Sequence, residues 1–147
     1  MAQYPGRLSH LTPGWVKDGA IFHIRIRTKS DSSLPLTDPV LAARVLDSAR
    51  FYHEQQRWNC PLLLLMPDHL HALVQFPFES KMNKIVGAWK AYQTKQHQIS
   101  WQTNFFDHRI RSDDELDEKA AYIRRNPVVK GLCVEEEAWP WVFCGDP

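Results

Sequence analysis

An apolar hairpin that carries two histidines is the feature that most constrains how this chain can fold. An apolar run over residues 61–66 is followed by Pro67-Asp68 and then by a second strand-like run over residues 69–76. Proline fixes φ at the first turn position, and aspartate tolerates the backbone conformation of the next position, so the pair predicts a tight turn. We therefore expect a rigid and otherwise apolar hairpin over about residues 60–76.

His69 and His71 lie at the start of the second run. Successive side chains of a strand point to opposite faces, so positions i and i+2 share a face, with their Cα atoms about 7 Å apart. Two imidazoles placed in this way can converge on one metal ion. Taken alone, however, the pattern also fits a structural or incidental pair, so metal binding can be inferred only together with other residues.

Composition indicates an ordinary globular chain. Its 147 residues suffice for one domain with a real core, and we expect a single domain over residues 1–147. The net charge is only +1, so any positively charged surface that binds nucleic acid must be a local patch.

The cysteines and the N-terminus favour a cytoplasmic protein. Cys60, Cys133 and Cys144 are widely spaced and form no CxxC pair, which argues against a disulfide framework and against a cysteine zinc site. Residues 1–6 lack the apolar core of a signal peptide, and no apolar run approaches the ~18 residues that span a membrane.

The order of the expected segments predicts an α+β fold. Asp38-Pro39 and Ser112 mark helix starts, whereas Pro127 predicts that the last helix ends near Asn126. The order β-α-β-β-α-β is typical of a ferredoxin-like antiparallel sheet with helices on one face, here followed by a C-terminal helix. The expected strands cover residues 20–27, 60–66, 69–76 and 105–111, and the expected helices cover residues 39–56, 80–96 and 112–126.

Tyr122 and Asn126 are four residues apart on the last helix and therefore share one helical face. If that face meets a metal held by the histidines, Asn126 is a plausible third ligand and Tyr122 a nucleophile beside it. Tyrosine has a pKa of about 10, so it needs activation by a base or a metal. Taken singly, Tyr122 fits a half-buried helix residue and Asn126 a helix terminator.

Three segments, over residues 66–71, 101–111 and 122–132, occur in the order found in the single-tyrosine HUH transposases, which the chain resembles over about residues 16–143. The Asn-Pro after the tyrosine and the closing Trp-Pro-Trp at 139–141 look most like the branch associated with repetitive extragenic palindromes (REP). The resemblance implies a ferredoxin-like fold and nicking of single-stranded DNA near hairpins. The branch commonly has asparagine where this chain has Asp68, whose carboxylate adds negative charge near the proposed ion.

Carried over by position, the resemblance makes Tyr122 the nucleophile that forms a 5′-phosphotyrosine link, and His69, His71 and Asn126 the ligands of a divalent ion. Such an ion lowers the cost of the charge that develops on the phosphate oxygens. Mixed nitrogen and oxygen ligation tolerates Mn²⁺, whereas Mg²⁺ prefers oxygen, and we expect one of the two. The imidazoles must be neutral to bind metal, so activity should fall at low pH.

Contacts with DNA are expected from local basic and aromatic residues. Basic side chains neutralise phosphates, and exposed aromatic side chains stack on unpaired bases. The lysines of the second helix also fit a merely solvated face, and His108 fits a strand anchor as well as a phosphate contact. The candidates are Lys81, Lys84, Lys90, Trp101, His108, Arg109, Arg111, Arg124, Arg125 and Lys130.

Two other functions stay open at this stage: a domesticated, non-catalytic binder of DNA hairpins, and a metal-dependent phosphoesterase that uses water while Tyr122 merely packs. The expected partner is single-stranded DNA with REP-like hairpins, which would place the cytoplasmic protein on the nucleoid. The chain could act as a monomer or a homodimer, and the site could form within one chain or between two.

Overall fold

The computed structural model of the chain describes residues 11–32 and 34–146. The N-terminal segment considered above for a signal peptide lies outside the described residues. Within the described part, no helix is both long enough and apolar enough to cross a bilayer.

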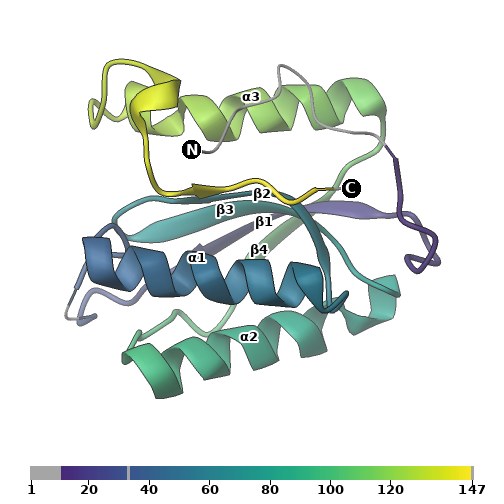
Figure 1. Cartoon of the computed structure of the whole chain (residues 1–147), viewed down its shortest axis with the longest axis horizontal. Helices are drawn as coiled ribbons and strands as arrows, with labels where there is room; N and C mark the ends of the chain where they lie inside the picture. The colour runs from purple at the N-terminus through teal and green to yellow at the C-terminus, as the bar shows by residue number, and fades with distance from the viewer. Residues whose placement is uncertain (1–10, 33, 147) are drawn as a thin grey trace.

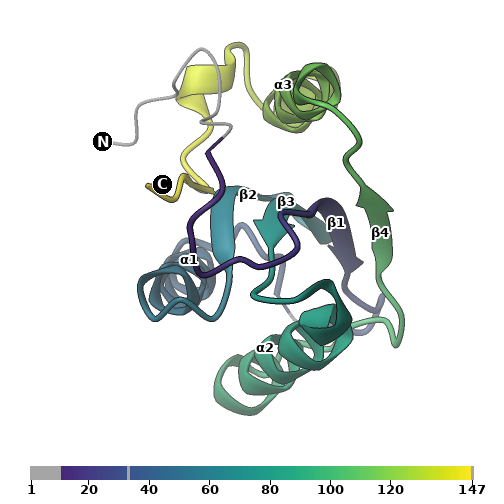
Figure 2. The ribbon, with the colours of Figure 1, turned by 90° about the vertical axis from the view of Figure 1, so that its right-hand side faces the viewer.

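One antiparallel sheet of five strands forms the centre of the fold, in the order β4-β1-β3-β2-β5. Helices α1 and α2 cover one face of the sheet and α3 covers the other (Figures 1 and 2). The predicted α+β, ferredoxin-like fold with an added C-terminal helix is confirmed. The strands are β1 (Ile21–Arg27), β2 (Asn59–Leu65), β3 (His69–Gln75), β4 (Phe106–Arg109) and β5 (Val142–Phe143), and the helices are α1 (Pro39–Glu54), α2 (Met82–His97) and α3 (Asp113–Val129), with short 3₁₀ turns η1 (Glu79–Lys81) and η2 (Glu136–Ala138).

The two faces of the sheet bury separate apolar clusters. Alternate residues of β1, such as Phe22 and Ile24, join the larger cluster under α1 and α2. On the other face, Leu62, Leu64 and Leu73 join a smaller cluster under α3. Since side chains alternate across a strand, β2 and β3 each supply both clusters at once.

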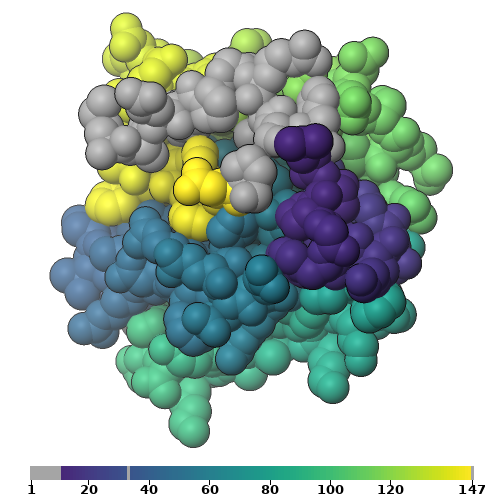
Figure 3. Space-filling model, turned by 45° about the vertical axis from the view of Figure 1, so that its right-hand side comes forward, coloured from purple at the N-terminus to yellow at the C-terminus, as the bar shows by residue number. Residues whose placement is uncertain are grey.

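The C-terminal segment adds a strand that the sequence patterns did not predict. β5 pairs with β2 at the sheet edge, and the backbone N–H of Gly145 donates to the Cys60 carbonyl at 3.1 Å. The segment, yellow in Figure 3, lies against α1. At this contact, His53 Nε2 is 2.7 Å from the Asp146 carbonyl oxygen.

Helix α3 begins where the sequence predicts and ends later than predicted. The Ser112 hydroxyl accepts a hydrogen bond from the Glu115 backbone N–H at 3.1 Å, as an N-cap does. The predicted end near Asn126 is wrong, because the helix continues through Pro127 to Val129. Pro127 has no N–H to donate to the Ile123 carbonyl, so it removes one helical hydrogen bond, and its restriction on Asn126 disfavours the helical conformation there without excluding it.

Gly131 ends the helix instead. Its φ of 74° places it in the left-handed region, and its N–H donates to the Val128 carbonyl at 3.0 Å. The Leu132 N–H donates to the Pro127 carbonyl at 2.8 Å, which completes a Schellman motif. This cap fixes the last turn of the helix that carries Asn126.

Candidate active site

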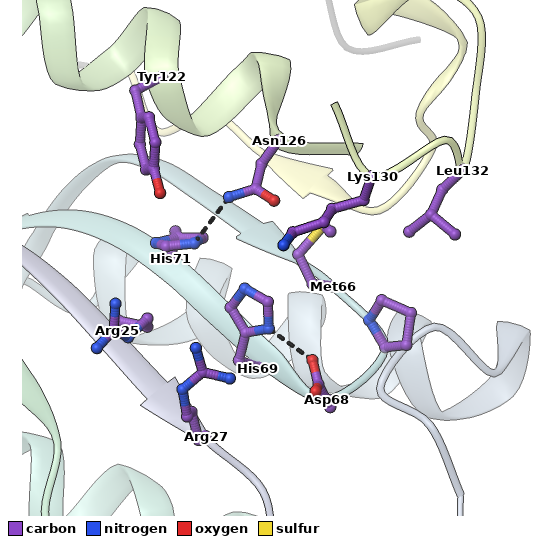
Figure 4. Close-up of a pocket in the computed structure, with 11 residues that line it drawn as sticks. Arg25, Arg27, Met66, Asp68, His69, His71, Tyr122, Asn126, Lys130 and Leu132 are labelled. Carbon is purple, nitrogen blue, oxygen red and sulfur yellow. Dashed lines mark hydrogen bonds and ion pairs between the residues drawn. The ribbon is translucent and has the colours of Figure 1, made fainter. Parts of the chain in front are cut away.

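His69 and His71 point from β3 toward α3, and both are buried. In the antiparallel pairing with β1, Arg27 lies opposite His69 and Arg25 lies opposite His71. Paired residues of two strands share a face, so two guanidinium groups flank the two imidazoles (Figure 4). The sequence patterns did not identify either arginine as a site residue. The alternation of Arg25 and Arg27 along β1 predicts that they share a face, but it does not predict which strand lies beside β1.

Helix α3 brings Tyr122 and Asn126 over the same pocket. Asn126 Nδ2 is 3.2 Å from His71 Nε2, and the rings of Tyr122 and His71 lie 5.9 Å apart between centroids at 86°. Tyr122 is 55% exposed and lines the pocket, so its side chain is within reach of a ligand there. A single chain thus brings together all four residues that were proposed for chemistry.

These residues line an open pocket with a volume of ≈ 430 Å³. Asp68, Arg25, Arg27 and Lys130 also lie in its wall. Figure 4 shows the side chains of α3 above the pocket and those of β1 and β3 below it. Three cations and one carboxylate give the wall an excess of positive charge, which suits a phosphate group.

Each histidine has a partner at its Nδ1 atom. His69 Nδ1 is 2.6 Å from Asp68 Oδ1, and His71 Nδ1 is 3.0 Å from Nε2 of His23 on β1. The sequence pattern gave no role to His23, which is buried, because the contact depends on how β1 and β3 pair.

Burial keeps the imidazoles neutral. Desolvation is the largest cause that lowers the pKa of His71 to about 3, and the electrostatic effect of nearby His69 is the second largest. Desolvation is also the largest cause that lowers the pKa of His23 to about 4, and the charge of Lys119 comes second. Burial also lowers the pKa of His69, against the opposing effect of the Asp68 carboxylate. Neutral imidazoles have a free lone pair, which is the state that binds a metal.

The residues present fit a divalent ion. The Oδ1 atom of Asn126 is buried and has no hydrogen-bond partner among the described residues, which leaves an acceptor beside His71 Nε2. Two imidazole nitrogens and one amide oxygen form a mixed donor set of the kind that Mn²⁺ accepts. Within the described part of the chain, no group of three or more His, Cys, Asp or Glu side chains could hold a metal, so the amide of Asn126 is essential to this assignment.

Several predicted DNA contacts are engaged inside the protein. Trp101 was expected to be exposed for stacking, which is wrong: it is 7% exposed, packs beside Trp89 and donates from Nε1 to the Lys90 carbonyl. Its strand-like bridge to Thr28 draws it into the larger core. Arg124 is also buried, since it lies on the face of α3 that packs toward the sheet, so a surface contact with DNA is not available to it.

Other candidates have partners at the surface. Lys90 Nζ donates to the carbonyls of Gln102 and Thr103, and His108 Nε2 lies 3.0 Å from Glu115 Oε2, which favours the strand-anchor interpretation of His108. Arg109 and Arg125 form ion pairs with Glu79 and Glu136.

The remaining candidates differ in their distance from the pocket. Lys81 and Lys84 lie at or near the start of α2, on the face of the sheet away from α3 (Figure 2). Arg111 is exposed just before α3. Among the predicted DNA contacts, Lys130 is the one that lines the pocket.

Comparison with known proteins supports the resemblance. The chain is 27% identical over 96 residues to a Haemophilus influenzae protein whose name assigns it provisionally to the REP-associated tyrosine transposases. The match covers 54% of each protein, so the chain spans about half the length of this curated relative. No family model matches the chain.

Solved structures share the fold. One is a REP-associated tyrosine transposase bound to a REP hairpin, with a TM-score of 0.65 and 20% identity over 97% of this chain and 82% of that one. Another is a Deinococcus radiodurans protein provisionally named a transposase, with a TM-score of 0.52 and 15% identity over 83% of this chain and 96% of that one. The chain is therefore an α+β protein of the architecture seen in these transposases. In sequence and fold it is similar to REP-associated tyrosine transposases, which confirms the predicted resemblance.

Proposed function

We propose that this chain nicks and rejoins single-stranded DNA at or near hairpins, through a covalent bond between Tyr122 and a 5′-phosphate. The observation that carries the proposal is that α3 holds Tyr122 and Asn126 over His69 and His71 in one open, electropositive pocket. A protein that only binds hairpins has no need of this combination. The hairpin bound by the structural neighbour supports the choice of substrate.

The chemistry assigned to this chain needs no external energy source. The Tyr122 hydroxyl oxygen attacks the scissile phosphorus, the bond from phosphorus to the 3′ oxygen breaks, and a proton ends on that oxygen to give a 3′-hydroxyl. A 3′-hydroxyl that attacks the phosphotyrosine reverses the step and rejoins DNA. The cations of the pocket wall, Arg25, Arg27 and Lys130, pair with phosphate oxygens and hold the strand in register.

His69, His71 and Asn126 would hold a divalent ion, Mg²⁺ or Mn²⁺. When bound, such an ion supplies positive charge that stabilises the phosphate oxygens as negative charge builds on them.

Covalent trapping tests the proposal. The protein is incubated with a labelled DNA hairpin that has single-stranded flanks, in Mn²⁺, and is then run on a denaturing gel. We expect a labelled protein band from the wild type and none from Tyr122→Phe, because phenylalanine keeps the ring and removes the nucleophile. A His69→Ala/His71→Ala variant should also lose the band.

The alternatives give other patterns. Cleavage that persists in Tyr122→Phe without any protein–DNA band would favour the water-using phosphoesterase. Tight hairpin binding with no cleavage by the wild type would favour the non-catalytic binder. A band of full intensity from the double histidine variant would refute metal dependence and would leave the role of Tyr122 as nucleophile unaffected.

A further inference from the structure

The two proposed metal ligands differ in what contacts their second ring nitrogen. The Nδ1 atom of His69 faces a carboxylate, that of Asp68, at 2.6 Å. The Nδ1 atom of His71 faces a neutral ring, that of His23, at 3.0 Å. A histidine that binds metal through Nε2 carries its proton on Nδ1, and that proton needs an acceptor.

We propose that Asp68 and His23 are positioning residues, which accept the Nδ1 protons of His69 and His71 and so leave both Nε2 lone pairs free for one ion. This inference rests on the proposed function, because it assigns these residues a purpose in holding the divalent ion.

Asn126 supports the direction of the hydrogen bonds at His71. Its Nδ2 group can only donate, and it lies 3.2 Å from His71 Nε2, so in the metal-free protein this nitrogen is the acceptor and the proton belongs on Nδ1. A bound ion would take the place of this amide donor at the Nε2 lone pair. His23 Nε2 must then accept from His71. The opposite direction, with the proton on His71 Nε2, would close that nitrogen to a metal.

The geometry also restrains both rings. His23 is 4% exposed and its ring lies beside that of His71, with 5.2 Å between ring centroids and an interplanar angle of 27°. Asp68 lies in the turn between β2 and β3, next to its partner in the chain, so the hairpin itself holds the carboxylate beside His69. Partners of this kind typically account for about 10–100-fold in metal affinity.

Matched substitutions separate the hydrogen bond from the bulk of each side chain. His23→Gln keeps an acceptor at the end of the side chain, whereas His23→Phe keeps a ring and removes the acceptor. Asp68→Asn keeps an acceptor oxygen in the turn, whereas Asp68→Ala removes it. Asp107→Asn is the control for charge. Asp107 pairs with Ile24, and this pair lies on the face of the sheet away from the pocket.

Two measurements test the inference on the full chain. Nitrogen-15 NMR of histidine-labelled protein reports which ring nitrogen carries the proton, and Mn²⁺ titration reports metal affinity. We expect Nδ1 protons on His69 and His71 in the wild type. We also expect Mn²⁺ affinity to fall about 10–100-fold in His23→Phe and Asp68→Ala, less in His23→Gln and Asp68→Asn, and not in Asp107→Asn.

A wild-type spectrum with the proton on Nε2 of His71 or of His69 would overturn the assignment for that ring, and this result needs no variant to fold. Equal losses of Mn²⁺ affinity in His23→Phe and His23→Gln would also overturn the role of His23. If the wild type binds no Mn²⁺ although both protons lie on Nδ1, the metal-dependent function fails while the tautomer assignment stands. Hairpin affinity without metal should stay the same in the His23 variants, since His23 does not line the pocket and its replacement removes no phosphate contact.

Discussion

Replacing the cations of the pocket should weaken DNA binding in a way that salt reveals. Arg25 and Arg27 lie on β1 and Lys130 follows α3, yet all three line one pocket. If each neutralises one phosphate of the bound strand, the triple variant Arg25→Gln/Arg27→Gln/Lys130→Gln loses three phosphate contacts. Glutamine keeps most of each side-chain stem, so packing changes little while the charge is lost.

The magnitude follows from counterion release. Each phosphate contact on a single strand contributes about 0.7 to the slope of the logarithm of affinity against the logarithm of salt concentration, so three contacts contribute about 2.1. Between 50 and 200 mM salt, one contact therefore accounts for about 2.6-fold in affinity and three for about 18-fold. The wild type should lose affinity more steeply than the triple variant by this ratio.

The assay measures hairpin binding by fluorescence anisotropy over a series of salt concentrations, without metal, so that no cleavage interferes. Lys84→Gln is the matched control, because Lys84 lies on α2 across the sheet from the pocket. An unchanged slope in the triple variant would refute the phosphate assignment. A change of about 0.7 in the slope of Lys84→Gln, one third of the change in the triple variant, would show that the whole surface binds DNA without preference for the pocket.

Stability should respond to pH and to the helix cap. The pKa values of His71 and His23, about 3 and about 4, lie below the ordinary value of 6.5, so the unfolded chain binds more protons below that value. Stability is therefore full above pH 6.5 and falls as pH drops toward those values. By pH 5 the loss should be of order 2 kcal/mol for each histidine, and urea unfolding of metal-free protein that is equally stable at pH 7 and pH 5 would contradict this. Gly131→Ala should destabilise the protein by about 1 kcal/mol, because alanine disfavours a φ of 74°. Gly14→Ala is the control, and equal unfolding midpoints for the two variants would refute the role of the cap. Leu64→Ala should cost about 2–5 kcal/mol in thermal unfolding, since Leu64 is fully buried under α3, and a smaller loss would mean that α3 closes over the cavity.

Local patterns predicted what depends on neighbours in sequence. The hairpin, the Ser112 cap and the shared face of Tyr122 and Asn126 each follow from a few adjacent residues, and the fold confirms the segment order. The partners of the histidines depend on strand register instead. The sequence does not state that Arg25 lies opposite His71, or that His23 reaches its Nδ1 atom.

The burial of Trp101 also depends on a residue that is distant in the sequence. Its place in a polar segment between a helix and a strand suggested exposure. A long-range bridge to Thr28 buries it, and nothing in the local sequence encodes that bridge. The end of α3 differs from this, because it follows from a local motif: the Schellman cap at Gly131 outweighs the effect of Pro127.

The position of the pocket follows from how α3 covers its face of the sheet. The face is apolar where Leu62, Leu64 and Leu73 meet the buried residues of α3, and this contact anchors the helix. The neighbouring part carries the polar side chains of β1 and β3, His69 and His71 among them, and an apolar helix could not cover these without leaving polar groups unpaired. Tyr122 lies where the helix surface turns from buried to exposed, so it overhangs this polar part. Packing of the apolar half therefore positions the tyrosine relative to the histidines, and the proposed chemistry lies at the boundary between the two halves.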